Sequence, residues 1–191
     1  MTYRPFHCPA HIYFVTGTII QWLSIFEQDG YSEIILDSLH WHRQYKKMKL
    51  FAFVIMPNHL HWISLPLTPY TINDTIQSFA SFTAHEILNM ARINFHEELL
   101  AAFSRAAKPG KDHRIWMNFQ AKNIFSERFL LQKLEYIHNN PVEKDWCLHN
   151  NRTDYKLSTA CFYDEGKDPV IQIDDLYEYL VNTNKLNLIL A

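Results

Sequence analysis

The stretch Phe51-Ala-Phe-Val-Ile-Met56-Pro-Asn-His59-Leu-His61-Trp-Ile63 decides the fold of this chain. It predicts a hydrophobic strand over 50–56, a turn at the Pro-Asn pair and a second strand over 59–65. Side chains two apart in a strand project from the same face, so His59 and His61 should aim at one point while the residue between them enters the opposite layer. Two imidazoles that converge from a rigid strand can hold one divalent cation. The alternative is a pair of strand histidines with a purely structural role.

The remainder of the chain predicts strands and helices around this pair. The expected elements are a strand over 11–18, a helix from Ser32 to about Lys49, a long amphipathic helix from Thr71, further helix over 95–107, a strand over 115–119, a helix over 127–139 capped by Ser126, and a short helix over 173–180. Residues 142–163 are expected to be mainly irregular. This order predicts an α+β fold with a ferredoxin-like, split βαβ antiparallel sheet. Its helices would pack on one face, with an added C-terminal helix carrying Tyr136, and the histidines would be exposed on the open face.

Length and composition indicate a folded protein with one domain, or one domain with a terminal extension. The 191 residues are 48% hydrophobic and 15% aromatic, which is enough to bury a core. We expect a domain over 1–165 and a C-terminal extension with a short helix over 166–191. The net charge of −2 excludes a general basic field, so any contact with nucleic acid depends on local patches or a metal.

The cysteines and the apolar start of the chain bear on its location. Cys8, Cys147 and Cys161 form no CxxC pair and no even disulfide framework, which favours a reduced, cytoplasmic compartment. Residues 5–26 carry no charged side chain, but they include histidines, a glutamine and a polar Thr-Gly-Thr break. We therefore expect no membrane span and no signal peptide.

A second constellation occurs at the end of the helix predicted over 127–139. The segment reads Lys133-Leu-Glu-Tyr136-Ile-His138-Asn-Asn140-Pro141-Val. Tyr136 and Asn140 are four residues apart and can project from one helical face, while His138 falls on another. A tyrosine can attack phosphorus, and an amide oxygen suits Mg²⁺ or Mn²⁺. The alternative is an ordinary helix end, with Asn at the cap and Pro following it.

Basic residues gather in two places. Arg43, Lys46 and Lys47 lie near the end of the first helix, and Arg114 ends a second cluster near the Lys-Pro-Gly-Lys breaker at 108–111. Such clusters are usually solvated helix faces, and contact with phosphate is the less common role. The candidate DNA contacts are Arg43, Lys46, Lys47, Lys133 and Arg114. His85, on the long helix, is expected to be partly buried and not a ligand.

The combination of Met56-Pro-Asn-His-Leu-His61 with Tyr136-Ile-His-Asn-Asn-Pro-Val142 resembles the single-tyrosine HUH transposases of the insertion-sequence type, in particular the REP-associated tyrosine transposases. The resemblance spans residues 11–160, and the two motifs occur in the family's order. Ile115-Trp116 adds to it, as does Asp154-Tyr-Lys-Leu-Ser-Thr-Ala160, which is similar to the family's Tyr-Pro-x-Ser-Ser-Ala segment.

This resemblance implies nicking and strand transfer on single-stranded DNA, often folded as a hairpin. His59 and His61 would be the metal pair, Asn140 the third ligand, and Mg²⁺ or Mn²⁺ the cofactor. Tyr136 would be the nucleophile that forms a 5′-phosphotyrosine link and releases a 3′-hydroxyl. Because the link conserves the phosphodiester energy, attack by another 3′-hydroxyl rejoins DNA without ATP.

Two departures from the family pattern bear on DNA affinity. Phe79-Ala80-Ser-Phe-Thr-Ala84 has alanine where relatives carry lysine, and Phe119-Gln-Ala-Lys122 stands where some members place histidines. Two other functions remain open: a non-catalytic hairpin-binding module of the same fold, and a His-metal phosphoesterase with water as nucleophile. The sequence leaves open whether the chain is a monomer or a homodimer.

Overall fold

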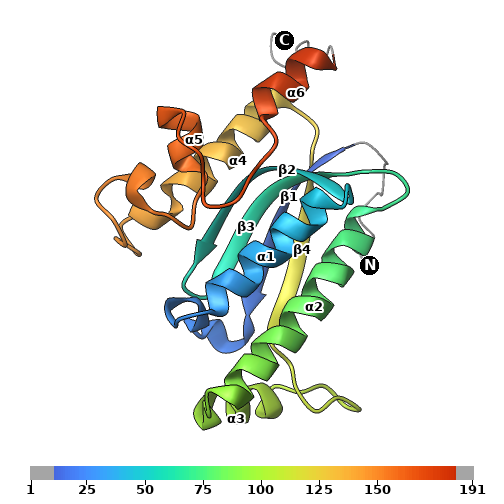
Figure 1. Cartoon of the computed structure of the whole chain (residues 1–191), viewed down its shortest axis with the longest axis vertical. Helices are drawn as coiled ribbons and strands as arrows, with labels where there is room; N and C mark the ends of the chain where they lie inside the picture. Colours follow the sequence, from blue (N-terminus) through green and yellow to red (C-terminus); the bar gives the residue numbers. More distant parts are fainter. Residues whose placement is uncertain (1–10, 184–191) are drawn as a thin grey trace.

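The computed structural model describes residues 11–183, in which a four-stranded antiparallel sheet lies between layers of helix (Figure 1). The strands are β1 (Ile12–Ile19), β2 (Met48–Met56), β3 (His59–Pro66) and β4 (Trp116–Ile124). The helices are α1 (Tyr31–Gln44), α2 (Ile72–Ile93), α3 (Glu97–Arg105), α4 (Glu127–Asn139), α5 (Ala160–Glu165) and α6 (Leu176–Asn182). Short 3₁₀ turns are η1 (Ile20–Trp22), η2 (Ile25–Glu27), η3 (Asn140–Val142) and η4 (Arg152–Asp154).

The strand order confirms the predicted α+β fold. The strands are arranged β2-β3-β1-β4, and β3 pairs antiparallel with both β1 and β2. β1 and β2 therefore run parallel with β3 between them, and α1 is the crossover that joins them. This is the split βαβ arrangement, completed by α2 and the edge strand β4.

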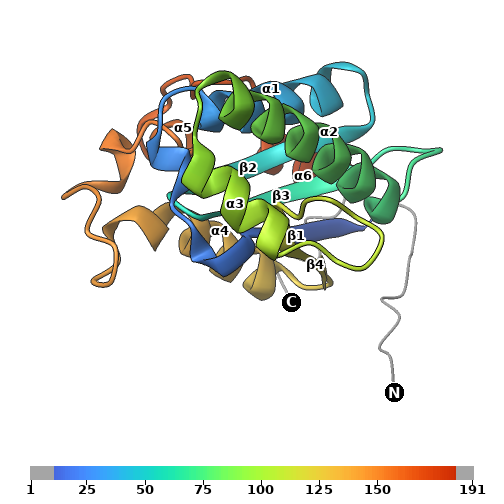
Figure 2. The same ribbon diagram turned by 90° about the horizontal axis from the view of Figure 1, so that it is seen from below.

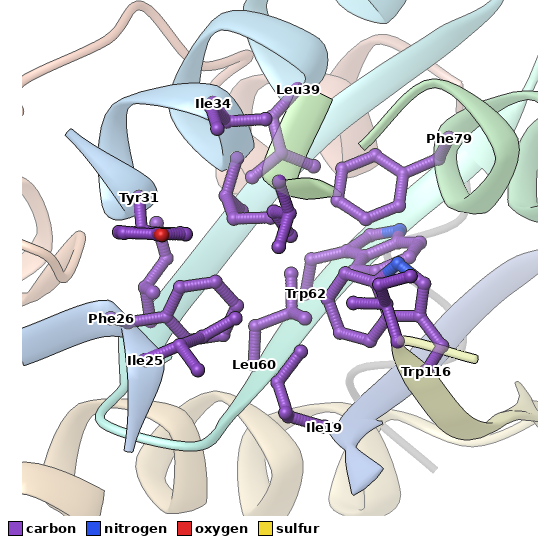
Figure 3. Close-up of a cluster of buried hydrophobic side chains, with 14 of the residues drawn as sticks. Ile19, Ile25, Phe26, Tyr31, Ile34, Leu39, Leu60, Trp62, Phe79 and Trp116 are labelled. Atoms are coloured by element: carbon purple, nitrogen blue, oxygen red, sulfur yellow. The ribbon is translucent and has the colours of Figure 1, made fainter. Parts of the chain in front are cut away.

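The alternation of side chains along β3 divides the interior into two cores. Leu60 and Trp62 enter the first core, between the sheet and the helices α1 and α2, where Trp62 packs against Phe79 of α2 (Figure 3). Ile63 and Leu65 enter the second core on the opposite face, with α4 and α6. Figure 2 shows α1 and α2 on one side of the sheet and α4 on the other.

Both faces of the sheet are thus covered, which corrects one expectation. The histidine face was predicted to be open, yet His59 and His61 are only 6% and 4% exposed. The physical reason is α4, whose apolar side chains Leu130, Leu134 and Ile137 pack against this face. The added helix that carries Tyr136 is therefore also the cover of the site.

Several boundaries differ from the sequence prediction, including the last helix, predicted over 173–180 and observed as α6 (Leu176–Asn182), and the strand predicted over 115–119, observed as β4 (Trp116–Ile124). The first helix ends at Gln44, because Lys46 has a left-handed conformation with φ of 52° and Met48 already pairs in β2. The helix over 95–107 is a separate element, α3, since Phe95 has φ of 54° and breaks the chain after α2. The helix over 127–139 and its cap are confirmed, with Ser126 Oγ accepting from the Phe129 amide at 3.3 Å.

The segment predicted to be irregular closes the outer edge of β2. The Ile55 amide donates to the Leu157 carbonyl at 2.9 Å, and the Thr159 amide donates to the Phe53 carbonyl at 3.1 Å. The short helix α5 follows directly. The segment resembling the family's Tyr-Pro-x-Ser-Ser-Ala motif therefore satisfies an edge that would otherwise expose unpaired backbone groups. Residues after 165 continue this role, as the Asp174 amide donates to the Leu50 carbonyl at 2.7 Å.

Arg152 holds the exposed side of α4 in place. Its guanidinium donates to Asp164 at 2.6 and 2.7 Å and to Glu135 of α4 at 2.7 Å. A fourth hydrogen bond joins it to Asn139 Oδ1 at 3.1 Å. Forked contacts of this kind specify geometry more strongly than a single ion pair. The last turn of α4, which carries Tyr136, is thus fastened to η4 and α5.

The structure also bears on the expectations about the cysteines and about membrane spans. Cys147 and Cys161 carry free thiols, while Cys8 lies outside the described residues. In the described part of the chain, none of the helices has the length and apolar character needed to cross a membrane.

Gly17→Ala should destabilise the sheet, because Gly17 lies between Leu60 and Phe119 on the neighbouring strands. An added Cβ would be 2.9 Å from Phe119 Cζ and 3.0 Å from Leu60 Cδ2. We expect the free energy of unfolding to fall by about 1–3 kcal/mol, as for overpacking in other cores. Urea denaturation of the parent protein and of Gly17→Ala measures this difference in the free energy of unfolding. In the Phe119→Leu background the cost should shrink, and strictly additive costs would contradict this explanation.

Candidate active site

The histidines converge at one end of the sheet. His61 lies opposite Thr16 of β1, and His59 lies opposite Thr18. Both imidazoles project from the α4 face, and their ring centroids are 4.9 Å apart. The structure therefore brings the two rings together on a rigid central strand.

A hydrogen-bond chain determines which nitrogen of His59 is free. Asn58 donates through Nδ2 to the Trp22 carbonyl at 3.1 Å, so its Oδ1 is the end that faces His59. Oδ1 lies 2.7 Å from His59 Nδ1 and must accept a hydrogen bond from it. In a neutral imidazole, Nε2 then keeps its lone pair. Burial lowers the pKa of His59 to about 4, so the ring is neutral at pH 7.

His61 is held in a similar way. Its Nδ1 lies 2.8 Å from Thr16 Oγ1, and its ring stacks on Phe14 with centroids 5.1 Å apart. Its Nε2 is buried and has no hydrogen-bond partner. Burial, with smaller contributions from the charges of His59 and Lys133, lowers the pKa of His61 to about 3. A buried, unpaired ring nitrogen of this kind requires an explanation, and a ligand is one.

Tyr136 and Asn140 approach the histidines from α4 and the turn that follows it. The ring of Tyr136 lies 5.1 Å from that of His61, edge to face, and Tyr136 remains 46% exposed. Asn140, at the next turn, is 4% exposed, and its Nδ2 has no partner. These side chains line a cleft of about 480 Å³ together with residues of β1, β3 and β4. The phenol of Tyr136 is thus available to a substrate, while Asn140 lies deeper.

Two lysines add positive charge to this cleft. Lys133 Nζ lies 5.1 Å from the Tyr136 ring centroid and 4.9 Å from that of Phe14. Lys122, on β4, is paired across the sheet with Phe14. Partial burial, with a smaller contribution from Lys122, lowers the pKa of Lys133. Within residues 11–183 neither lysine forms an ion pair with a carboxylate, so both charges are available to an anion.

The other basic candidates lie elsewhere. Lys46 and Lys47 precede β2, whose opposite end pairs with His59, so about 26 Å of strand separates them from the histidines. Arg43 is engaged by Asp174 at 2.9 Å, and Lys47 lies over the Trp41 ring at 4.5 Å. Arg114 donates to the carbonyls of Trp116 and Met117 and is not among the residues lining the cleft.

Two further histidines are outside the site. His138 is buried on another face of α4, as predicted, and its Nε2 lies 3.1 Å from Thr159 Oγ1. His85 was expected to be partly buried, but its side chain is 69% exposed and contacts Asn89 at 3.0 Å. The reason is that α2 buries the face that carries Phe79, Thr83 and Ile87 instead.

The structure also shows where the two departures from the family pattern lie relative to the cleft. Ala80 packs against the first core, on the face of the sheet opposite the histidines, so the missing lysine does not remove a charge from the cleft. Trp116 donates through Nε1 to Thr83 Oγ1 at 3.1 Å, which makes the Ile115-Trp116 similarity a feature of the core. Lys122 lies in the segment where some members of the family that the sequence resembles place histidines, and it brings a charge into the cleft.

Sequence reasoning did not find several residues of the cleft. These are Phe14, Thr16, Thr18 and Gln120 from the strands, and Trp22 and Trp146 from loops. The strand residues could be identified only from the register of β1 against β3 and β4, which the sequence does not specify. The two tryptophans carry no local signal at all.

The side chains that could bind a divalent cation here are two histidines and an asparagine. This donor set contains no carboxylate. The described residues contain no group of three His, Cys, Asp or Glu side chains gathered for a metal. The available donors are two neutral imidazole nitrogens and the side-chain amide of Asn140. Such a set leaves coordination positions for water and phosphate oxygens, and the nitrogen donors suit Mn²⁺ better than Mg²⁺.

A known transposase structure shares this architecture. A REP-associated tyrosine transposase bound to a REP hairpin has a TM-score of 0.64 and 18% identity, over 92% of this chain and 93% of that chain. At this identity the likeness concerns the fold, which is the fold of that transposase. A protein of Deinococcus radiodurans assigned as a transposase has a TM-score of 0.40 and 17% identity, over 73% of this chain and 96% of that chain, too low to support an argument. No protein-family model and no curated protein matches the sequence.

Stability should decrease as the pH falls below about 6.5, because burial lowers the pKa values of His59, His61 and His138 to about 4, 3 and 4. The unfolded chain, with histidine pKa near 6.5, binds more protons in this window, so acid favours unfolding. Urea midpoints between pH 7.5 and 5 measure the effect. His138→Gln should flatten the dependence, whereas the exposed-site variant His85→Gln should not. A pH-independent midpoint would contradict the neutral, buried rings.

Proposed function

We propose that this chain belongs to the REP-associated tyrosine transposases and that it cuts and rejoins single-stranded DNA through Tyr136. The observation that carries the proposal is the distance of 5.1 Å between the rings of Tyr136 and His61, in a cleft that also holds His59 and Asn140. A tyrosine hydroxyl, the unpaired Nε2 of His61 and two lysines that form no ion pair with a carboxylate within residues 11–183 occur together there. The shared fold with a transposase bound to a REP hairpin supports a hairpin substrate.

In this proposal His59, His61 and Asn140 hold Mg²⁺ or Mn²⁺. The bound cation would polarise a phosphate oxygen and offset the charge that develops during transfer. Asn58 and Thr16 contribute indirectly, because their contacts with the two Nδ1 atoms orient the rings and leave Nε2 as the nitrogen that would bind the cation. Burial keeps both imidazoles unprotonated at neutral pH, which is the state that can donate an electron pair to a metal.

The chemical step is a transesterification. Tyr136 Oη attacks the phosphorus and forms a new P–O bond, and the bond from phosphorus to the 3′-oxygen breaks. The phenolic proton is lost to water, and the departing 3′-oxygen takes up a proton as a hydroxyl group. A second 3′-hydroxyl reverses the step and restores a phosphodiester. No energy source is required, since one phosphoester replaces another.

The lysines supply the charge that the whole chain lacks. With a net charge of −2, the protein has no general attraction for DNA. Lys122 and Lys133 concentrate two positive charges beside Tyr136, where a phosphate would lie during transfer. A DNA substrate and the free thiols of Cys147 and Cys161 also fit the predicted cytoplasmic location.

Incubation with labelled single-stranded hairpins and Mn²⁺ should give a covalent DNA adduct on Tyr136, detected by denaturing gel and mass spectrometry. Tyr136→Phe should abolish the adduct, because the nucleophilic oxygen is lost. His61→Ala should reduce it by more than the roughly 10–100-fold that loss of an outer-shell partner costs, because a direct ligand is lost. Tyr45→Phe is the matched control, since Tyr45 is also exposed but caps the C-terminus of α1, outside the cleft.

The same experiment separates the alternatives. Hairpin binding without an adduct in the parent protein would favour a non-catalytic binding module. Phosphoester cleavage that survives Tyr136→Phe but is lost in His59→Ala would favour a metal hydrolase with water as the nucleophile.

Lys133→Ala and Lys122→Ala should each weaken single-stranded DNA binding and reduce the slope of log K against log salt by about 0.7–1, the effect of one lost phosphate contact. Fluorescence anisotropy at several salt concentrations measures both quantities in the Tyr136→Phe background. Lys46→Gln tests the basic cluster at the C-terminal end of α1 and should leave the slope unchanged. An equal loss in Lys46→Gln would move the DNA path to α1.

A further inference from the structure

Trp22 has an unusual backbone and an unusual exposure. It follows β1 in the turn η1, and both Gln21 and Trp22 adopt left-handed conformations, with φ of 53° and 56°. Residues with a side chain rarely occupy this region, and two in succession persist only where surrounding contacts hold them. The indole of Trp22 is nevertheless 55% exposed, so burial of its ring does not account for the strained turn.

The contacts that hold the turn lead directly to the proposed metal site. The Trp22 carbonyl accepts the hydrogen bond from Asn58 Nδ2 at 3.1 Å, and Asn58 also orients His59. On the preceding side, the Ile19 amide donates to the Asn58 carbonyl at 3.0 Å, and the Ile20 amide donates to the Ile115 carbonyl at 2.9 Å. The main chain around Trp22 is therefore fixed relative to His59.

The indole lies at the edge of the cleft. Trp22 lines the cleft, and its ring centroid is 6.0 Å from that of His59, edge to face. Trp146, from the loop after α4, lies 5.5 Å from the same imidazole and is partly buried in the second core. Cys147, which follows Trp146, also has a positive φ, of 45°. Two loops distant in the sequence thus bring an indole each to His59.

We propose that Trp22 is a stacking platform for one unpaired nucleobase of the DNA strand, with Trp146 as a wall of the same subsite. The inference rests on the proposed function, since it assigns a place to the base next to the phosphate that Tyr136 attacks. Every nucleobase offers a π-face to an exposed aromatic ring, so a platform of this kind orients a strand without requiring a particular sequence. Such a platform distinguishes single-stranded from duplex DNA, because a base in a duplex is already stacked on the neighbouring base pairs and cannot stack on the indole.

Comparison with another exposed tryptophan supports the assignment. Trp41, on α1, is 40% exposed, but the ammonium group of Lys47 lies over its ring at 4.5 Å. No cation lies over the ring of Trp22 among the residues that the structure describes. Lys122 and Lys133 are present in the same cleft to receive the phosphates on either side of a stacked base.

The test uses the Tyr136→Phe protein without added metal, so that only binding is measured. A set of otherwise identical single-stranded hairpin oligonucleotides carries one abasic site at each unpaired position in turn. With the Tyr136→Phe protein, an abasic site at one of these positions should weaken binding about 10-fold, which is in the range expected for loss of one base–aromatic stack. In Trp22→Leu, which keeps apolar bulk without a π-face, all intact oligonucleotides should bind about 10-fold more weakly, and the abasic penalty at that position should disappear. Trp22→Phe should restore most of the affinity, and Trp41→Leu should change neither quantity.

The outcomes separate this inference from the proposed function. If Trp22→Leu binds every oligonucleotide as the parent does while Lys133→Ala binds more weakly, the stacking subsite is overturned and the DNA function stands. A Trp22→Leu protein with lower affinity but an unchanged abasic penalty overturns it as well, since the loss then has another origin. If the parent protein binds no single-stranded DNA, both proposals fail. Thermal unfolding of each variant, with the rescue by Trp22→Phe, distinguishes loss of stacking from loss of fold.

Discussion

The packing of α4 on the histidine face of the sheet is the contact on which the rest of the site depends. Leu130, Leu134 and Ile137 are buried against this face, each worth roughly 1.5–3 kcal/mol of transfer free energy. The same helix presents Tyr136 and Lys133 beside its buried stripe, so the burial that holds the helix also positions the phenol and the ammonium group. The fork of Arg152 fastens the outer side of the last turn. A helix with weaker packing would leave the two histidines on an open sheet, with no tyrosine beside them.

Burial also determines the chemical state of the site. A carboxylate buried at the position of His59 or His61 would require a positively charged partner. A neutral imidazole can be buried there if one of its nitrogens is hydrogen-bonded. Asn58 and Thr16 provide those bonds, and the remaining nitrogen of His61 is buried without a partner. Asn58 has a double role, because it joins His59 to the strained turn at Trp22. The Pro-Asn turn between β2 and β3 is therefore part of the site as well as a connection between strands.

The distribution of charge matters more here than its sum. The chain is slightly acidic, and the basic cluster on α1 is partly neutralised by Asp174 or placed over aromatic rings. The two lysines in the cleft have no acidic partner among the described residues and come from different elements, β4 and α4. A polyanion is thus attracted locally, beside the residues that would act on it. The net charge of −2 is compatible with such a local site for an anion.

Local signals in the sequence determined most of the fold and half of the site. The period-2 pattern around His59 and His61, the cap at Ser126 and the stop at Pro141 are properties of neighbouring residues, so the strands, the helix over 127–139 and the spacing of Tyr136 and Asn140 could be predicted. Which strand lies next to which, and in what register, depends on contacts between distant segments. Only the tertiary structure therefore revealed Thr16 behind His61, Lys122 beside Lys133, and the two tryptophans at His59. It also decided that the histidine face is covered, because whether a helix packs on a sheet depends on the complementarity of two surfaces that are far apart in the sequence.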